Sequence, residues 1–111
     1  MISIIITAYK EEKTIGKAIE SILKQEMLED FELICVAPDE ETGRVIGEYA
    51  KNDRHINYVK DPGKGKPSAL NLALEKAKGS ILVLTDGDVF LGENSIKELI
   101  KHFDDEKVGI V

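Results

Sequence analysis

The sequence predicts an α/β fold, a Rossmann-like and mostly parallel sheet flanked by helices. Apolar runs of strand length alternate with segments of helical periodicity over all 111 residues, which is typical of right-handed βαβ units. Residues 81–84 are continuously apolar, as expected of a parallel strand that is covered on both faces. No internal repeat, low-complexity segment or linker interrupts the pattern, so we expect residues 1–111 to form a single domain.

The first third of the chain is predicted to hold two strands and a helix. Residues 1–7 are apolar and β-rich, and we expect them to form the first strand. Apolar residues then recur at helical spacing from about residue 11 to 24, which predicts an amphipathic helix. Glu11 and Glu12 would lie in its first turn, where acidic side chains suit the helix dipole. Residues 31–36 are predicted to be the second strand.

A second helix is predicted over residues 40–52, followed by a short strand over residues 56–59. Gly43 and Gly47 weaken the helix, because glycine in a helix interior costs about 1 kcal/mol relative to alanine. An apolar stripe at helical spacing favours the helix nonetheless.

Residues 60–67 form the one loop that is rich in glycine and lysine. Pro67 suits the first position of a third helix, which Gly79 is expected to end. After the next strand, a fourth helix is predicted over residues 93–103, and residues 108–111 begin a fifth strand.

The composition is that of an ordinary globular protein, with 42% hydrophobic and 32% charged residues. Fifteen basic against 21 acidic residues give a net charge of -6 without a basic face, so nucleic acid is not expected as a partner. The apolar stretches are too short to span a bilayer, and no signal peptide begins the chain. The single cysteine, Cys35, is expected to be a buried hydrophobe, which fits a reducing, cytoplasmic location. Attachment to the cytoplasmic face of a membrane would need a region outside these residues.

The strand at residues 81–84 leads directly into Thr85-Asp86-Gly87-Asp88, an Asp-X-Asp motif. Open α/β sheets place their ligands at the carboxyl ends of such strands. If the backbone stays extended through Gly87, Asp86 and Asp88 share one face and reach the same cation. Asp-Gly is also a common turn dipeptide, so a simple turn is the alternative. Because two like charges this close repel, we expect a divalent metal, Mn²⁺ or Mg²⁺, between them.

Two more polar clusters follow apolar strands and therefore lie along the same edge of a parallel sheet. Thr7-Ala8-Tyr9 follows the first strand, and Asp39 follows the second. The Tyr9 ring can stack on a base or sugar, while Thr7 and Asp39 offer hydrogen bonds. The alternatives are that Tyr9 covers the sheet edge and that Asp39 is a turn residue.

Lys64 and Lys66 lead into a helix N-terminus, where anions are favoured, although a solvated loop is the simplest interpretation of them. The loop is not a Walker A motif, because Lys60 stands where that motif has glycine and Pro67 replaces its Ser or Thr. A dinucleotide-type GxGxxG after the first strand is also absent. Together with the Asp pair, these features suit a nucleotide diphosphate.

The chain resembles the N-terminal, nucleotide-binding half of a family 2 glycosyltransferase. These are inverting enzymes of the GT-A fold that use nucleotide-diphospho-sugar donors. No single motif is specific, but their order and spacing over nearly the whole chain carry the resemblance. The matching segments are residues 5–12, Ile15 with residues 21–23, Gly65-Lys66 with Ala69-Leu70-Asn71, and residues 84–88.

The resemblance implies roles for residues at the sheet edge. Thr7 and Tyr9 would line the nucleoside pocket, and Asp86 would approach the ribose or the sugar of a UDP- or GDP-sugar. Asp88 would bind the metal on the diphosphate. The residues then expected to bind the donor are Thr7, Tyr9, Glu11, Asp39, Lys66 and Asp86, with Asp88 and Asp86 at the metal.

Two departures from the family pattern concern the nucleobase and the first loop. The family usually has two adjacent aspartates after the second strand, one of which reads the base, but this chain has Ala37 and Pro38 there. Asp39, the next residue, is the substitute, which leaves the identity of the base open. Lys10 stands where the family commonly has asparagine.

The resemblance places the catalytic base and the acceptor-binding segments well beyond the metal motif, so no residue of this chain is assigned as general base. A donor-binding segment of a sugar-transferring enzyme is the leading hypothesis, and a nucleotide or nucleotide-sugar binding module without catalysis is the alternative. A receiver-like phosphoacceptor domain is disfavoured, because its acidic pair should follow the first strand. A segment of a longer enzyme would leave apolar faces uncovered, so we expect self-association.

Overall fold

The structure is a computed structural model, which describes residues 1–25, 30–92 and 95–100. Strands and helices alternate along these residues, as the sequence predicts. In chain order they are β1 (Ile2–Thr7), α1 (Ile15–Leu23), β2 (Phe31–Ala37), α2 (Glu40–Asn52), β3 (Ile56–Lys60), α3 (Lys66–Lys76), β4 (Ile81–Asp86) and α4 (Ser95–Ile100).

The described strands form one parallel sheet in the order β3-β2-β1-β4. In its register, Ile2 of β1 lies opposite Phe31 of β2 and Ile81 of β4. Because all four strands run in the same direction, their carboxyl ends meet at one edge. The predicted fold class, an α/β Rossmann-like parallel sheet, is confirmed.

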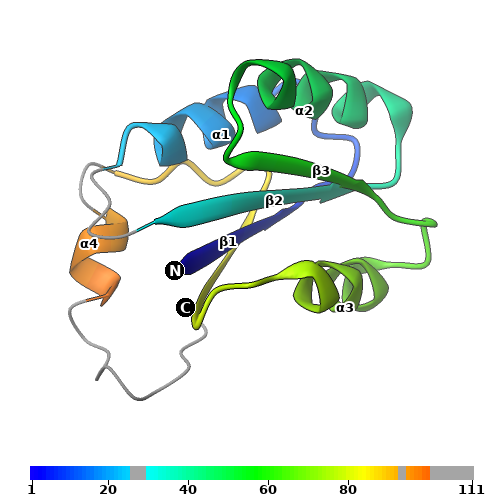
Figure 1. The fold of residues 1–111 in the computed structure, drawn as a ribbon. Coiled ribbons are helices and arrows are strands. Elements are labelled where there is room, and N and C mark those ends of the chain that lie inside the picture. The colour runs from blue at the N-terminus through cyan, green and yellow to red at the C-terminus, as the bar shows by residue number, and fades with distance from the viewer. Residues whose placement is uncertain (26–29, 93–94, 101–111) are drawn as a thin grey trace.

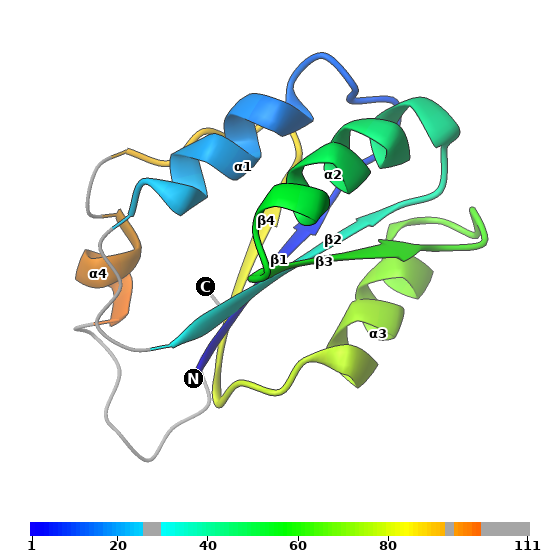
Figure 2. The ribbon, with the colours of Figure 1, turned by 45° about the horizontal axis from the view of Figure 1, so that its top comes forward.

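Helices cover both faces of the sheet, with α1 and α2 on one side and α3 on the other (Figures 1 and 2). The central strand β1 is buried along its whole length. Because side chains alternate along a strand, Ile4 packs in the core beneath α1 and α2, while Ile5 packs in the core beneath α3. Ile96 of α4 joins the first of these cores. Cys35 is fully buried, as predicted, and burial raises the pKa of its thiol far above the ordinary value.

Residues 81–84 contact both cores, Ile81 and Val83 the first and Leu84 the second, but they are less buried than expected in the described part of the chain. Strand β4 is an edge strand of the described sheet, and only Val83 within it is buried. Its apolar run resembles that of the central strand, but pairing order cannot be read from hydrophobicity. None of the described helices is long and apolar enough to cross a membrane.

The predicted start of the first helix is wrong by four residues, since α1 begins at Ile15. The carbonyl of Glu11 accepts hydrogen bonds from the N–H groups of Thr14 and Ile15, which makes a turn before the helix. Glu11 and Glu12 therefore precede α1, and no acidic residue occupies its first turn. Of the helix predicted over residues 93–103, the structure describes 95–100, and the predicted strand at 108–111 lies outside the described residues.

Gly79 has a different role from the predicted one, because α3 ends three residues earlier, at Lys76. A Cβ at Gly79 would lie 2.6 Å from the Met1 carbonyl oxygen, so only glycine fits this close approach. Its N–H donates to the Ser3 hydroxyl at 2.8 Å, and Ser3 donates to the buried Glu32 carboxylate at 2.6 Å. Glu32 also accepts the N–H of Lys78. This network connects the end of α3 to the sheet edge opposite the carboxyl ends.

The two glycines of α2 occupy different surroundings, although both were expected to weaken the helix. Gly43 is buried beneath the Tyr58 ring, and a Cβ there would overlap the Tyr58 hydroxyl. At Gly47 a Cβ would meet nothing within 4 Å. Only the first glycine is therefore required by packing.

Replacing these glycines by alanine should change stability in opposite directions. Gly47→Ala should stabilise the protein by roughly 0.5–1 kcal/mol, because alanine loses less backbone entropy in a helix. Gly43→Ala should destabilise it by about 1–3 kcal/mol, because the Tyr58 ring must move. Urea unfolding monitored by circular dichroism measures both free energies. Equal effects of the two substitutions would contradict the packing argument.

Candidate functional site

A cleft of about 610 Å³ lies at the carboxyl edge of the sheet. Each strand of the described sheet contributes to it through its last residue or the loop that follows. The lining residues are Thr7, Ala8, Tyr9, Glu11, Pro38, Asp39, Asp61, Gly63, Gly65, Lys66, Ala69, Asp86 and Asp88. The cleft thus brings together all seven residues that the sequence analysis proposed for donor and metal binding, and their roles there stay predictions.

Strand β4 ends at Asp86, the first residue of the Asp-X-Asp motif, so the condition of an extended backbone through Gly87 is not met. The Val89 N–H donates to the Asp86 carbonyl at 3.1 Å, which closes a turn. The Gly87 N–H donates to the Thr7 carbonyl at 3.0 Å, and a Cβ at Gly87 would lie 2.7 Å from that of Ala8. The turn that the sequence allowed is therefore present, while Asp86 and Asp88 both line the cleft and their binding of one cation stays a prediction.

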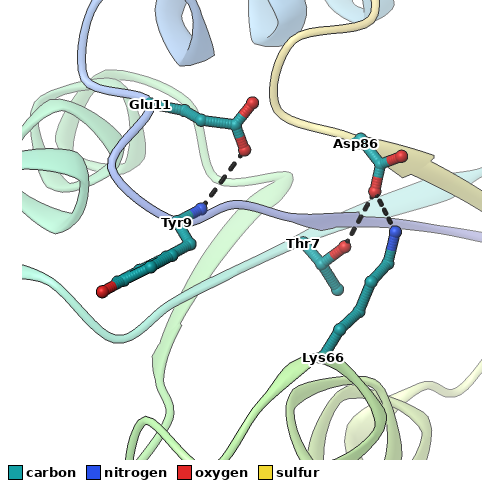
Figure 3. A network of polar contacts seen from close by, with 5 residues as sticks. All are labelled: Thr7, Tyr9, Glu11, Lys66 and Asp86. Carbon is teal, nitrogen blue, oxygen red and sulfur yellow. Dashed lines mark hydrogen bonds and ion pairs between the residues drawn. The ribbon is translucent and has the colours of Figure 1, made fainter.

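Lys66 and Thr7 hold the Asp86 carboxylate. The Lys66 ammonium lies 2.5 Å from Asp86 Oδ1, and the Thr7 hydroxyl donates to the same oxygen at 3.2 Å. Figure 3 shows the Lys66 side chain reaching from the start of α3 to the end of β4. Lys66 is therefore more than a solvated loop residue, whereas Lys64 is exposed and does not line the cleft.

Asp88 and Glu11 are the other carboxylates at this end of the cleft. Asp88 is exposed and makes no hydrogen bond or ion pair with the described residues. Glu11 Oε1 accepts the N–H of Tyr9 at 3.2 Å. Burial raises the pKa of the Glu11 carboxyl, and the nearby charges of Asp88 and Asp86 raise it further. The hydrogen bond from the Tyr9 N–H and the charge of Lys66 lower this pKa, but the net shift is upward. Burial is the main cause of the raised pKa of Glu11.

Asp39 is a helix cap that also lines the cleft, so it has a local structural role, and its part in donor binding stays a prediction. Its carboxylate caps α2 by accepting from the N–H of Thr42 at 3.2 Å and from the Thr42 hydroxyl at 2.7 Å. It also accepts the N–H of Lys10 at 3.0 Å. Burial raises the pKa of Asp39, but these hydrogen bonds outweigh burial and lower it overall.

The loop between β1 and α1 is fixed against α2 by these contacts. The N–H of Glu11 donates to the Thr42 hydroxyl at 2.9 Å, and Lys10 has a φ of 53, in the left-handed region. Tyr9, in the same loop, is 61% exposed and lines the cleft. The Lys10 ammonium lies over one face of the Tyr9 ring, 5.3 Å from its centre. Whether this ring stacks on a ligand or covers the sheet edge stays a prediction.

Asp61 is a cleft residue that the sequence analysis did not single out. It follows β3 as Asp39 follows β2, and this position after a strand was the available signal. It is 4% exposed, and its Oδ1 accepts the N–H of Gly63 at 2.7 Å. Gly63 and Gly65 have φ values of +79 and +103, which residues other than glycine rarely adopt. These glycines let the loop fold over the edge of the cleft.

The chemistry of the cleft fits a divalent cation. Among the described residues, no three His, Cys, Asp or Glu side chains lie close enough to hold a metal ion by themselves. Carboxylate oxygens are nevertheless the ligands that Mg²⁺ and Mn²⁺ prefer, and Mg²⁺ commonly takes only one or two carboxylates beside substrate phosphates. Asp88 is uncommitted and Asp86 is held only by Lys66 and Thr7, so both are suitable ligands.

Comparison with known proteins identifies related sequences and folds. A family model described as Glycosyl transferase family 2 matches residues 3–111. The chain is 31% identical over 114 residues to the uncharacterized glycosyltransferase EpsJ of Bacillus subtilis, covering 100% of this chain and 33% of EpsJ. It is 29% identical over 106 residues to chondroitin synthase of Escherichia coli, covering 93% of this chain and 15% of that protein.

A solved structure supports the same relationship. The chain matches the mannosyltransferase PcManGT from Pyrobaculum calidifontis, solved in complex with GDP-Man and Mn²⁺, with a TM-score of 0.87 at 26% identity. The match covers 97% of this chain and 33% of PcManGT. The chain therefore spans about a third of the length of EpsJ and of PcManGT.

The capping role of Asp39 predicts both a loss of stability and a change in its pH dependence. Asp39→Ala should destabilise the protein by about 1 kcal/mol, the usual cost of a lost helix cap. Because the pKa is lowered from 3.8 in the folded protein, the stabilisation is present above pH 3.8 and lost as pH falls through the lower, folded value. Asp39→Asn should therefore flatten the pH dependence of the melting temperature below about pH 4.

Thermal unfolding between pH 2.5 and 6 measures this effect, with the exposed Glu75→Gln on α3 as a charge-matched control. If the melting temperature of Asp39→Asn fell with pH as much as that of the unmodified protein, the capping role assigned to the Asp39 carboxylate would be contradicted.

Proposed function

The chain belongs to glycosyl transferase family 2, and we propose on that premise that its cleft binds a nucleotide-diphospho-sugar together with a divalent cation. The observation that carries this proposal is the gathering of five carboxylates, a lysine and an exposed tyrosine in one cleft at the carboxyl edge of a parallel sheet. Such edges are where open α/β folds bind nucleotides. The bound donor would then supply its sugar to an acceptor hydroxyl.

In this proposal, each cleft residue has a role that its surroundings support. The exposed Tyr9 ring would stack on the nucleoside, and Thr7, at the end of β1, lines the same cleft. Asp88 and Asp86 would hold the cation. A bound Mn²⁺ or Mg²⁺ would supply positive charge to stabilise the diphosphate as leaving group.

Lys66 would contact the diphosphate from the start of α3. Its ammonium has three N–H donors and uses one on Asp86, so it can contact a phosphate oxygen while keeping that ion pair. The position also agrees with the general preference of helix N-termini for anions. Glu11, held by the Tyr9 N–H, keeps the loop after β1 in place beside the donor.

PcManGT provides independent support, because its structure contains GDP-Man and Mn²⁺ and matches 97% of this chain. A guanosine or uridine diphosphate sugar with Mn²⁺ or Mg²⁺ is therefore the proposed ligand class. In an inverting displacement, a base must take the proton of the acceptor hydroxyl. We assign none of the described residues as this general base.

A module that binds the donor without transferring the sugar is the second candidate function. It is favoured by one observation, namely that no described residue lining the cleft is assigned as general base or as an acceptor contact. Measuring sugar transfer and donor hydrolysis beside binding separates the two candidates. Binding without either reaction would favour the module.

Calorimetric titration with GDP and UDP in the presence of Mn²⁺ tests the proposal directly. We expect binding that disappears with EDTA and weakens at least about tenfold in Asp88→Asn, the loss expected when a charged ligand is removed. The exposed Glu75→Gln removes the same charge far from the cleft and should bind normally. Binding that is equally strong in EDTA would overturn the role of the cation, and no binding of either nucleotide would overturn the proposed function.

We also propose that the chain, as given, self-associates. Among the described residues, Tyr9, Val89 and Phe90 are the exposed large hydrophobic side chains beyond the first residue, and β4 has an unpaired outer edge. Light scattering should give a mass above 12.3 kDa. A monomeric mass at micromolar concentration would contradict this expectation.

A further inference from the structure

We propose that Asp61 reads the nucleobase of the donor and that it selects guanine over uracil. The inference rests on the proposed function, because it concerns the base of the nucleotide that the cleft binds. It names a residue outside the set that the sequence analysis assigned to the donor.

Asp61 is a buried carboxylate with unused acceptor capacity. It lies at the end of β3, and its N–H donates to the Ala37 carbonyl at 3.3 Å. A carboxylate can accept about four hydrogen bonds, and the Gly63 N–H on Oδ1 is the one that Asp61 makes with the described residues. No fully enclosed side-chain oxygen of the described residues lacks a hydrogen-bond partner, so the unpartnered Oδ2 of Asp61 is at least partly exposed, and Asp61 lines the cleft.

Asp39 is the alternative reader of the base, but its carboxylate is already engaged. One oxygen accepts the N–H of Lys10, and the other accepts both the N–H and the hydroxyl of Thr42. Turning Asp39 toward a base would remove the cap of α2 and release the loop after β1. Oδ2 of Asp61 accepts no hydrogen bond from the described residues, so Asp61 can accept hydrogen bonds from a base without losing a structural contact.

The strand order puts Asp61 at the end of the cleft away from the ion pair. Strand β3 and strand β4 are the two outer strands of the described sheet, with β2 and β1 between them. Three strand spacings of about 4.8 Å separate Asp61 from Asp86 by roughly 14 Å, which leaves room for a nucleoside between them. Tyr9, which follows β1, lies between these ends. Asp39 and Asp61 line the same cleft, from the loops that follow the neighbouring strands β2 and β3.

A carboxylate at this place suits the hydrogen-bonding edge of guanine. Guanine presents two neighbouring donors, N1–H and the N2 amine, which one carboxylate accepts together. Uracil presents a single donor, N3–H, between two carbonyl oxygens that a carboxylate repels. A pairing of two hydrogen bonds discriminates between bases by roughly 1–3 kcal/mol, or about five- to 150-fold in affinity.

Calorimetric titration of the unmodified protein and of Asp61→Asn, each with GDP, UDP and xanthosine diphosphate in the presence of Mn²⁺, tests the inference. The unmodified protein should bind GDP at least about fivefold more tightly than UDP. The side-chain amide that Asp61→Asn introduces donates where the carboxylate accepts, so this variant should lose the preference for GDP. The same variant should gain affinity for xanthosine diphosphate, whose base carries a carbonyl at C2 in place of the amine.

The outcomes separate this inference from the proposed function. Equal binding of GDP and UDP by the unmodified protein would overturn the inference and leave the function standing, whereas binding of neither nucleotide would overturn both. Gain of xanthosine diphosphate binding cannot come from a misfolded variant, and UDP binding reports that Asp61→Asn is folded. Glu75→Gln, which removes the same charge from an exposed site on α3, should keep the GDP preference. If Asp61→Asn keeps the full preference for GDP, Asp61 does not read the base.

Discussion

The parallel pairing of four strands is the constraint on which the cleft depends. In the order β3-β2-β1-β4, the residues that follow each strand must lie side by side at one edge. Asp61, Asp39, Thr7 and Asp86 come from those four strands and are distant in sequence, yet all line one cleft. A strand pairing in the opposite direction would place its polar residue at the other end of the sheet. The site is therefore a consequence of the topology before any side chain is positioned.

Hydrogen bonds from the first loop to α2 turn this edge into a defined surface. Lys10 has a φ of 53, a conformation that costs a non-glycine residue about 1–2 kcal/mol. The N–H groups of Lys10 and Glu11, bound to Asp39 and Thr42, offset that cost. Asparagine, common in the family at the position of Lys10, tolerates the left-handed conformation better. The departure from the family pattern is thus accommodated by the cap of α2, which also occupies Asp39.

Much of the site could be predicted from sequence because polar residues after apolar strands must meet at one edge. That rule found Thr7, Tyr9 and Asp86, and it applies equally to Asp61, which was missed because its surroundings read as an ordinary glycine-rich turn. The edge position of β4 could not be predicted, since an apolar run does not show which strands it pairs with. Hydrophobic periodicity could not predict that α1 begins at Ile15, because that start depends on hydrogen bonds to the Glu11 carbonyl.

The charges of the cleft also set the direction in which a nucleotide can lie. Five of the lining residues are carboxylates, and Lys66 is the one lysine or arginine among them. Two unit charges 4 Å apart near a protein surface interact by about 4 kcal/mol, so a diphosphate avoids the carboxylates that lack a cation. Lys66 lies beside Asp86, at the end of β4, and Asp61 lies at the end of β3. In the proposed complex, the diphosphate would therefore lie near Lys66 and a cation held by Asp86 and Asp88, which would direct the base toward Asp61.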